Sequence, residues 1–162
     1  MEHQNAGFQY GKESLYLQSS FLSHQLGYVI ELGDMATSQQ LEAKLIPVLQ
    51  KLEEAQRNHS YRVLSALALA RGNLDCALDY AERSCNQHVS KRELANSLYL
   101  QAIVYAQRKN YARALQLIQE AETYPNFTLY RERLANLRHE VEAVGTVKLT
   151  VETSQPLNQI ER

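Results

Sequence analysis

The stretch "ARGNLDCALDYAERSC", residues 70–85, is similar in pattern to "QRKNYARALQLIQEAE", residues 107–122, which lies 37 residues later in the chain. In both copies a turn containing asparagine precedes a helical pattern with alanine at the same place, Ala77 or Ala114. A similar turn, "ELGDM" at residues 31–35, lies 39 residues before the first of them. A near-constant period of this length predicts stacked pairs of helices, because each pair must bury its apolar face against its neighbours.

The composition favours an all-α fold. The 162 residues include only three prolines and six glycines, and apolar residues recur at spacings of three and four nearly throughout. We therefore expect a flexible N-terminus at 1–12, a helical repeat domain at 13–144 and a tail at 145–162. The last predicted helix, 128–144, has one apolar stripe and charged outer faces, which fits the polar cap that a helical stack requires.

Local signals place the helix ends. Gly33 and Gly72 are expected to end helices, and Ser90 with Glu93 has the spacing of a capping box, as do Thr37 and Gln40. In the first predicted helix, 13–32, we expect an apolar stripe that faces the core, widened by further apolar residues. The stripe consists of Leu15, Leu22, Leu26 and Val29, and the residues that widen it are Phe21, Tyr28 and Ile30.

The tail has a different pattern. Val147, Leu149 and Val151 alternate with polar residues, as in a β-strand, but the chain offers no second strand pattern. A lone strand leaves its backbone hydrogen-bonding groups unpaired. The tail is thus predicted either to be disordered or to pair with another chain, in a homodimer or at a partner's sheet edge.

Charge and hydropathy exclude several classes of partner. With 17 basic and 18 acidic residues, the chain lacks the charge excess of a protein that binds nucleic acid or an anionic membrane. Its longest apolar stretch is shorter than the roughly 20 residues of a membrane span, and its N-terminus does not resemble a signal peptide. Cys76 and Cys85 are nine residues apart on one predicted helix, too far apart to form a disulfide. We expect a cytoplasmic protein.

Catalytic and metal-binding patterns are absent from the sequence. The five histidines form no ligand pair of metal-site spacing, and no glycine-rich phosphate loop or nucleophile motif occurs. We therefore predict no enzymatic activity, no metal and no cofactor.

The second repeat, which consists of residues 107–122 and the predicted helix before them, resembles a tetratricopeptide repeat (TPR). Leu98, Gln101, Ala102 and Tyr105 stand at the places of the W-x-x-L-G-x-x-Y motif, and Ala114, Ile118, Ala121 and Pro125 follow at family positions. The first repeat, which likewise includes the predicted helix before residues 70–85, matches the family pattern at Leu64, Ser65, Ala68, Ala77 and Ala81. Departures are Gln101 in place of leucine, Ser84 in place of the last alanine, and intervals longer than those of the family. The resemblance implies antiparallel helix pairs stacked as a short TPR-like superhelix with a C-terminal capping helix.

In that family the first helix of each pair lines a concave groove. By position, the resemblance implies a partner-binding groove formed by His59, Arg62, Val63, Ala66, Leu69, Asn96, Tyr99, Ile103 and Ala106. Independently, residues 94–107 contain no charged side chain, and residues 61–70 contain only Arg62. Such helices are either buried by their neighbours or shielded by a bound segment. If a groove exists, Tyr99 and Arg62 are its expected anchors, because tyrosine and arginine concentrate binding energy.

These features favour a protein-protein interaction module, an adaptor or chaperone that binds a peptide or helix of another protein. Its size and predicted architecture are similar to those of the class II chaperones of bacterial type III secretion. A structural subunit of a multi-protein assembly is the alternative, and a small-molecule or peptide-sensing regulator is a third.

Overall fold

The prediction of an all-α fold is confirmed. The computed structural model describes residues 2–85, 90–124 and 128–153, and the side chains of 11, 13–85, 90–124 and 131–144 among them. In this described part the chain forms α-helices, one short 3-10 helix and no strand. The helices are α1 (Glu2–Glu31), α2 (Met35–Gln50), α3 (Asn58–Ala70), α4 (Leu74–Arg83), α5 (Lys91–Gln107), α6 (Tyr111–Glu122) and α7 (Thr128–Thr153); the 3-10 helix is Glu54–Gln56.

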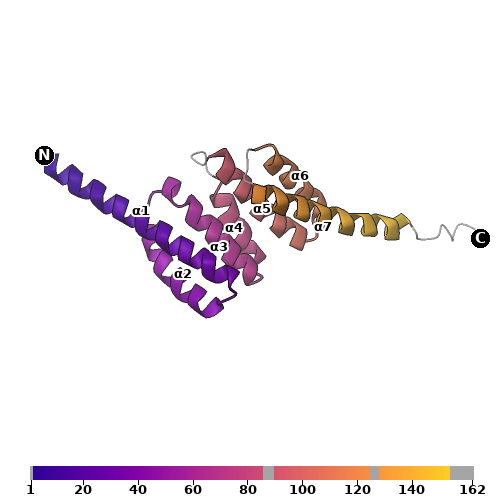
Figure 1. The fold of residues 1–162 in the computed structure, drawn as a ribbon, viewed down its shortest axis with the longest axis horizontal. Coiled ribbons are helices and arrows are strands. Elements are labelled where there is room, and N and C mark those ends of the chain that lie inside the picture. Colours follow the sequence, from indigo (N-terminus) through magenta and orange to yellow (C-terminus); the bar gives the residue numbers. More distant parts are fainter. Residues whose placement is uncertain (1, 86–89, 125–127, 154–162) are drawn as a thin grey trace, which may run out of the picture.

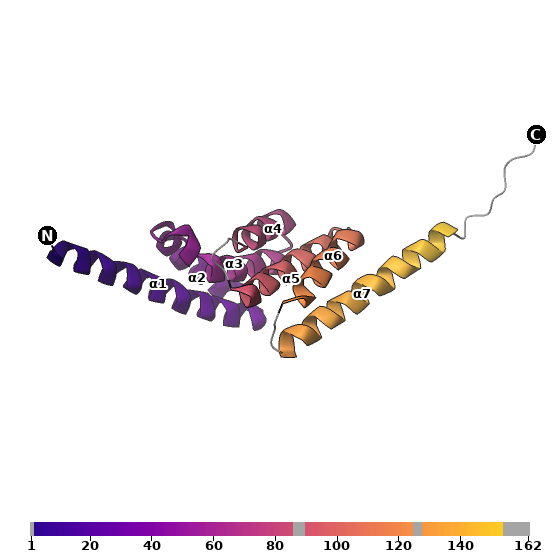
Figure 2. The same ribbon diagram turned by 90° about the horizontal axis from the view of Figure 1, so that it is seen from above.

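Consecutive helices pack as pairs, α1 with α2, α3 with α4, and α5 with α6. Contacts between α1 and α3, α3 and α5, and α4 and α5 join one pair to the next, and α7 packs on α6 and α5. The pairs therefore follow one another along the molecule, with α1 at one end and α7 at the other (Figures 1 and 2).

The three similar turns share one structure. Each contains a residue with positive φ, which is Gly33 (73°), Gly72 (72°) or Lys109 (61°). A Cβ added at either glycine would meet nothing within 4 Å. The glycines are therefore favoured by their backbone conformation and not by lack of space.

The residue after each positive φ caps the next helix. The side chains of Asp34, Asn73 and Asn110 accept the backbone N–H three residues later, at 3.0, 3.2 and 3.2 Å. Their own N–H groups donate to carbonyls five residues earlier, at 3.0, 2.9 and 2.9 Å, which is the closing bond of a Schellman motif. The prediction of a capping box at Thr37 is wrong. Helix α2 begins at Met35 with Asp34 as its N-cap, and the Asp34 carboxylate accepts the Thr37 N–H.

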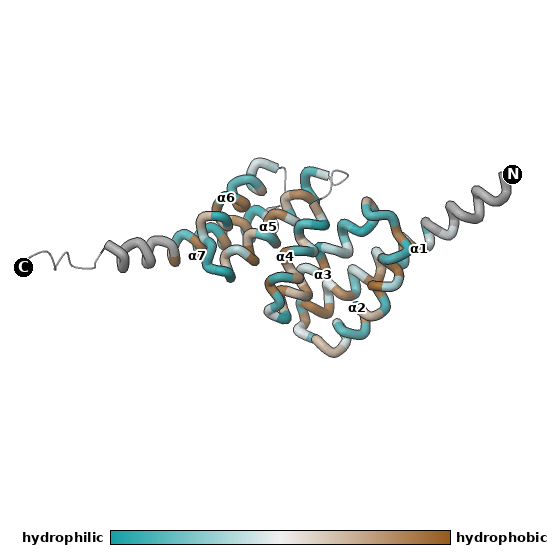
Figure 3. Tube along the Cα trace, turned by 180° about the vertical axis from the view of Figure 1, so that it is seen from behind, coloured by the Kyte–Doolittle hydropathy of each residue, from teal (hydrophilic) through white to brown (hydrophobic). Residues whose placement is uncertain are grey.

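Hydrophobic residues recur along the described parts of the helices (Figure 3), and together with small residues they build the core. Leu26, Leu45, Leu64 and Leu67 fill the first half, and Leu117, Ile118 and Leu134 fill the second. Between the helices lie alanines without solvent exposure, which let backbones approach closely: Ala77, Ala81, Ala95, Ala102, Ala114 and Ala121. Buried serine hydroxyls bridge neighbouring elements through the pairs Ser23–Ser60 (2.8 Å), Ser65–Ala77 carbonyl (2.8 Å) and Ser84–Ser97 (2.6 Å).

Both terminal helices are longer than predicted. Residues 2–12, expected to be a flexible N-terminus, belong to α1, and residues 145–153 of the expected tail belong to α7. The strand pattern at 147–151 was therefore misinterpreted. Val147 and Val151 are four residues apart and continue the spacing of Val141 and Val144, so the same sequence also suits a helix. Residues 154–162 of the tail lie outside the described residues.

One prediction for the first helix is also wrong. Phe21 and Tyr28, expected to widen the core stripe, are 63% and 64% exposed. The core face of α1 is formed by Leu22 and Leu26, with Leu15, Val29 and Ile30 packed beside them.

Candidate functional site

The predicted groove residues lie on α3 and α5, which contact each other in the middle of the stack. The α3 residues are His59, Arg62, Val63, Ala66 and Leu69, and the α5 residues are Asn96, Tyr99, Ile103 and Ala106. All nine are half-buried. We call this set the α3–α5 face. Neighbouring helices cover part of it, and the rest is open to solvent.

A polar pocket of about 210 Å³ lies where the α3–α5 face meets α1. From α3 it is lined by His59, Ser60 and Arg62, and Glu93 of α5 closes it. The remaining lining comes from α1 and the 3-10 helix, through Tyr16, Ser19, Ser20, His24 and Gln56. Two predicted groove residues therefore meet here with side chains from three other elements.

Two histidines pack against each other in this pocket. The ring centroids of His24 and His59 are 4.7 Å apart, and Nδ1 of His24 lies 2.7 Å from the Ser20 carbonyl oxygen. Burial lowers the pKa of His59 to about 4, helped by the charges of Arg62 and His24 and opposed by Glu93. His59 is therefore neutral at pH 7. Its buried Nε2 has no hydrogen-bond partner among the described residues.

Arg62 is held by Glu93. Its Nη2 donates to Oε1 of Glu93 at 3.1 Å, and the arginine side chain is only 11% exposed. Oε2 of Glu93 accepts from the Ser90 N–H and hydroxyl, at 3.0 and 2.9 Å, so the predicted capping box is confirmed. Burial tends to raise the pKa of Glu93, but the hydrogen bonds from Ser90 and the charge of Arg62 outweigh it and lower the pKa.

The second guanidinium nitrogen of Arg62, the buried Nη1, is unpaired, since it has no hydrogen-bond partner in the described part of the chain. Arg62 and His59 are three residues apart on α3 and therefore share one side of that helix. The N–H groups at Nη1 are donors, and their usual partners are carbonyl and carboxylate oxygens.

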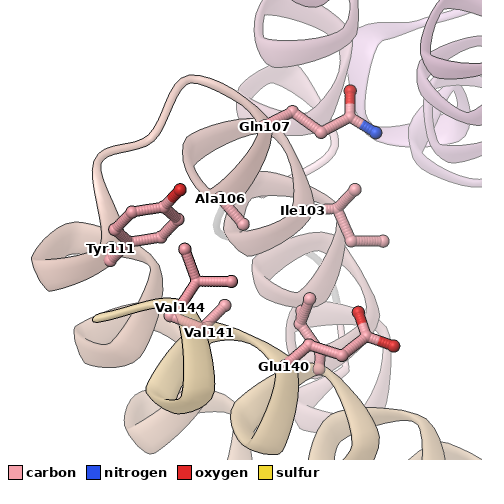
Figure 4. A pocket seen from close by; sticks show the side chains of 8 residues that line it. Ile103, Ala106, Gln107, Tyr111, Glu140, Val141 and Val144 are labelled. Atoms are coloured by element: carbon pink, nitrogen blue, oxygen red, sulfur yellow. The ribbon is translucent and has the colours of Figure 1, made fainter. Parts of the chain in front are cut away.

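An apolar hollow of about 280 Å³ lies between α5 and α7 (Figure 4). Its lining combines Ile103 and Ala106 of the α3–α5 face with Leu137, Val141 and Val144 of α7. Tyr111 of α6, Gln107 and Glu140 complete it. Val144 is 47% exposed, so the hollow opens to solvent. Its shape and lining suit an apolar side chain.

The other predicted residues line neither pocket. Val63 packs on the first core cluster, Leu69 on the cluster around Ala77, and Tyr99 on the cluster formed by α5, α6 and α7. Burial raises the pKa of Tyr99. Tyr99 is half-buried, as are the other eight residues of the α3–α5 face. The Oδ1 atom of Asn96 is buried without a hydrogen-bond partner among the described residues.

Sequence reasoning missed the contributions of α1 and α7. His24 is 35 residues from His59, and Glu93 is 31 residues from Arg62, so no local spacing connects them. The capping box identified Glu93 as a helix-start residue but carried no information about its ion pair. The apolar stripe predicted for the last helix includes Val141 and Val144, but its spacing carries no information about the hollow that they form with α5.

Within 2–85, 90–124 and 128–153, no group of three or more His, Cys, Asp or Glu side chains is arranged to hold a metal ion. Cys76 is exposed, Cys85 is half-buried, and both thiols are free. No helix in the described part of the chain is long and apolar enough to cross a membrane.

No family model matches this sequence, and neither a curated protein nor a solved structure matches it significantly.

Proposed function

We propose that this protein is an interaction module, an adaptor or chaperone, that binds a peptide or helix of a partner protein on the α3–α5 face. In this proposal the helix pairs are antiparallel and form a short TPR-like superhelix, with α7 as its cap. The observation that carries it is the presence of two pockets of different chemistry on this face, one polar and one apolar.

The distance between the two pockets suits a short bound segment of a partner protein. Glu93 in the polar pocket and Ile103 in the apolar hollow are ten residues apart on α5, which corresponds to roughly 15 Å of helix. An extended peptide covers roughly 15 Å in about five residues. The bound segment would place an apolar side chain in the hollow and a carbonyl or carboxylate oxygen near Arg62.

The proposed setting is the cytoplasm, where free cysteines such as Cys76 and Cys85 stay reduced. A chaperone that holds one secreted substrate, as the class II chaperones of type III secretion do, is one form that this function would take.

Site-specific photo-crosslinking in the native cell tests the proposal. A photoreactive amino acid at Ala106, in the hollow, is expected to capture one partner protein, whereas the same amino acid at exposed Glu120 of α6 is not. Crosslinks at Glu120 and not at Ala106 would instead support a structural subunit that uses its outer helices.

A matched pair of substitutions then measures the partner's affinity. Ala106→Glu places a charge in the apolar hollow, and Ala112→Glu places the same charge on the exposed side of α6. We expect Ala106→Glu to weaken binding of the captured partner by about tenfold or more, since desolvating one unpaired charge costs at least that much. Equal affinities of the two variants would contradict the α3–α5 face as the binding site.

A further inference from the structure

An apolar stripe runs along the solvent side of α1. It consists of Leu17, Phe21 and Tyr28 of α1 and of Leu32, which directly follows the helix; these side chains are 67%, 63%, 64% and 64% exposed. Because a helix advances about 100° per residue, these spacings of four, seven and four place the four side chains within about 60° of one another. The stripe faces away from the buried side of α1, where Leu22 and Leu26 lie. We call these four residues the α1 stripe.

The surroundings of the α1 stripe lack charge. Residues 14–30 include no Asp, Glu, Lys or Arg. The outermost helix of a stack normally presents a polar face to water, because nothing packs beyond it. Depletion of charge together with exposed aromatic residues is typical of the centre of a protein-protein interface. The α1 stripe therefore has the composition of a covered surface.

The stripe is symmetric along the helix. Phe21 and Tyr28 lie at equal distances from the midpoint between His24 and Gln25, and so do Leu17 and Leu32. A second α1 laid antiparallel about this midpoint would bring Phe21 against the partner's Tyr28 and Leu17 against the partner's Leu32. Matching of a patch with itself is the condition for a two-fold, isologous interface.

The exposed area is consistent with such an interface. Four side chains that are each about two-thirds exposed offer roughly 450 Å² of mainly apolar surface, taking 150–250 Å² for each full aromatic side chain and slightly less for leucine. A standard interface buries about 800 Å² on each partner. The stripe alone supplies about half of that area.

We propose that this protein forms a homodimer in which the α1 stripes of two copies pack antiparallel across a two-fold axis near His24 and Gln25. The self-complementarity of the stripe favours a second copy as the occupant. The dimer proposal does not rest on the partner site on α3 and α5, and the two surfaces meet at His24, which also lines the polar pocket.

Sedimentation tests the dimer. We expect the chain to sediment as a particle of twice its 18.5 kDa mass. The double substitution Phe21→Glu with Tyr28→Glu should weaken self-association about a hundredfold or more. Gln116→Glu with Gln119→Glu, which adds the same charges on exposed positions of α6, is expected to leave the dimer intact. Because Phe21 and Tyr28 are exposed, the charged variant should keep its helical circular dichroism. A wild-type chain that is monomeric at about 100 μM, or a dimer indifferent to the α1 charges, would overturn the proposal.

Cysteine crosslinking tests the orientation. In a Cys76→Ser background, Gln25→Cys should form an intermolecular disulfide, because its two copies lie one residue apart along the antiparallel helices, about 1.5 Å of rise. Gln18→Cys should not, because its copies lie 13 residues, or roughly 20 Å, apart. Disulfides at both positions would show parallel pairing and overturn the antiparallel arrangement, and disulfides at neither would overturn the interface.

Discussion

The two ends of the stack are built differently. At one end, α1 packs on both α2 and α3 through a buried face on which Leu22 and Leu26 alternate with serines, and its outer side carries the α1 stripe. At the other end, α7 packs on α6 and α5 through Leu134 and Val141, and its outer side carries charged residues. A stack of helix pairs needs a polar outer face at each end. The α7 end has a polar outer face. The α1 end exposes the apolar α1 stripe, which another surface would have to cover.

The attachments of the two helices also differ in kind. Arg138 of α7 makes a two-pronged ion pair with Glu122 of α6, with nitrogen-oxygen distances of 3.0 and 2.5 Å. The α1 end depends instead on leucine packing, the buried Ser23–Ser60 bond and the polar pocket with His24 and His59. Apolar packing therefore has more weight at the α1 end, and exposed charge pairing has more at the α7 end.

The largest effect is expected from the buried face of α1. Leu26 is fully buried, so Leu26→Ala should lower the free energy of unfolding by about 2–5 kcal/mol through lost burial and a residual cavity. Leu17→Ala, on the exposed face of the same helix, should change it by no more than about 0.5 kcal/mol in the monomer. Urea unfolding followed by circular dichroism at low protein concentration measures both. Equal losses would contradict the assignment of the two faces.

The polar pocket at the α1 end should make stability depend on pH. Because the pKa of His59 is about 4 in the folded chain and 6.5 as its ordinary value, the unfolded chain binds a proton that the folded chain does not. Stability should therefore fall as the pH drops from 6.5 to 4, by about 2–3 kcal/mol from this residue. Unfolding of the wild type and of His59→Gln between pH 7.5 and 4 isolates the contribution. Parallel pH profiles would refute it.

A smaller loss is expected from the Arg62–Glu93 pair. Glu93→Gln preserves a capping-box side chain but removes the charge opposite a mostly buried arginine, which should cost about 1–2 kcal/mol. Glu42→Gln serves as the control, since Glu42 pairs with the more exposed Arg71 at 2.7 Å and should contribute less than about 1 kcal/mol. Thermal unfolding ranks the two variants, and a larger loss in Glu42→Gln would reverse the interpretation.

The smallest effect should come from the α7 end. Arg138→Met is expected to cost about 0.5–1 kcal/mol, and this loss should shrink in high salt, because the pair with Glu122 is at the surface. Arg131→Met, also exposed on α7, should change stability by only a few tenths of a kcal/mol. A salt-independent loss for Arg138→Met would show that Arg138 contributes through packing of its alkyl chain and not through its charge.

Local sequence signals determined much of the fold. The positive-φ turns at Gly33 and Gly72, the Asn110 cap and the Ser90–Glu93 capping box involve residues within a few positions of each other, so their geometry follows from neighbouring dihedrals and hydrogen bonds. The periodic alanines similarly indicated where helices approach closely. Spacing alone did not decide where the terminal helices end, because the pattern at Val147 and Val151 suits both a strand and a helix.

Only the tertiary structure decided which faces are covered. The sequence of α1 places apolar residues on both sides, and packing against α2 and α3 selected Leu22 and Leu26 for the core while Phe21 and Tyr28 stayed in solvent. It also brought His24 to His59 and Glu93 to Arg62, across separations of more than 30 residues. Helix propensity and capping act over one or two turns, whereas burial and ion pairing depend on elements that meet in space, so the sequence by itself determined the helices and the tertiary structure determined the site.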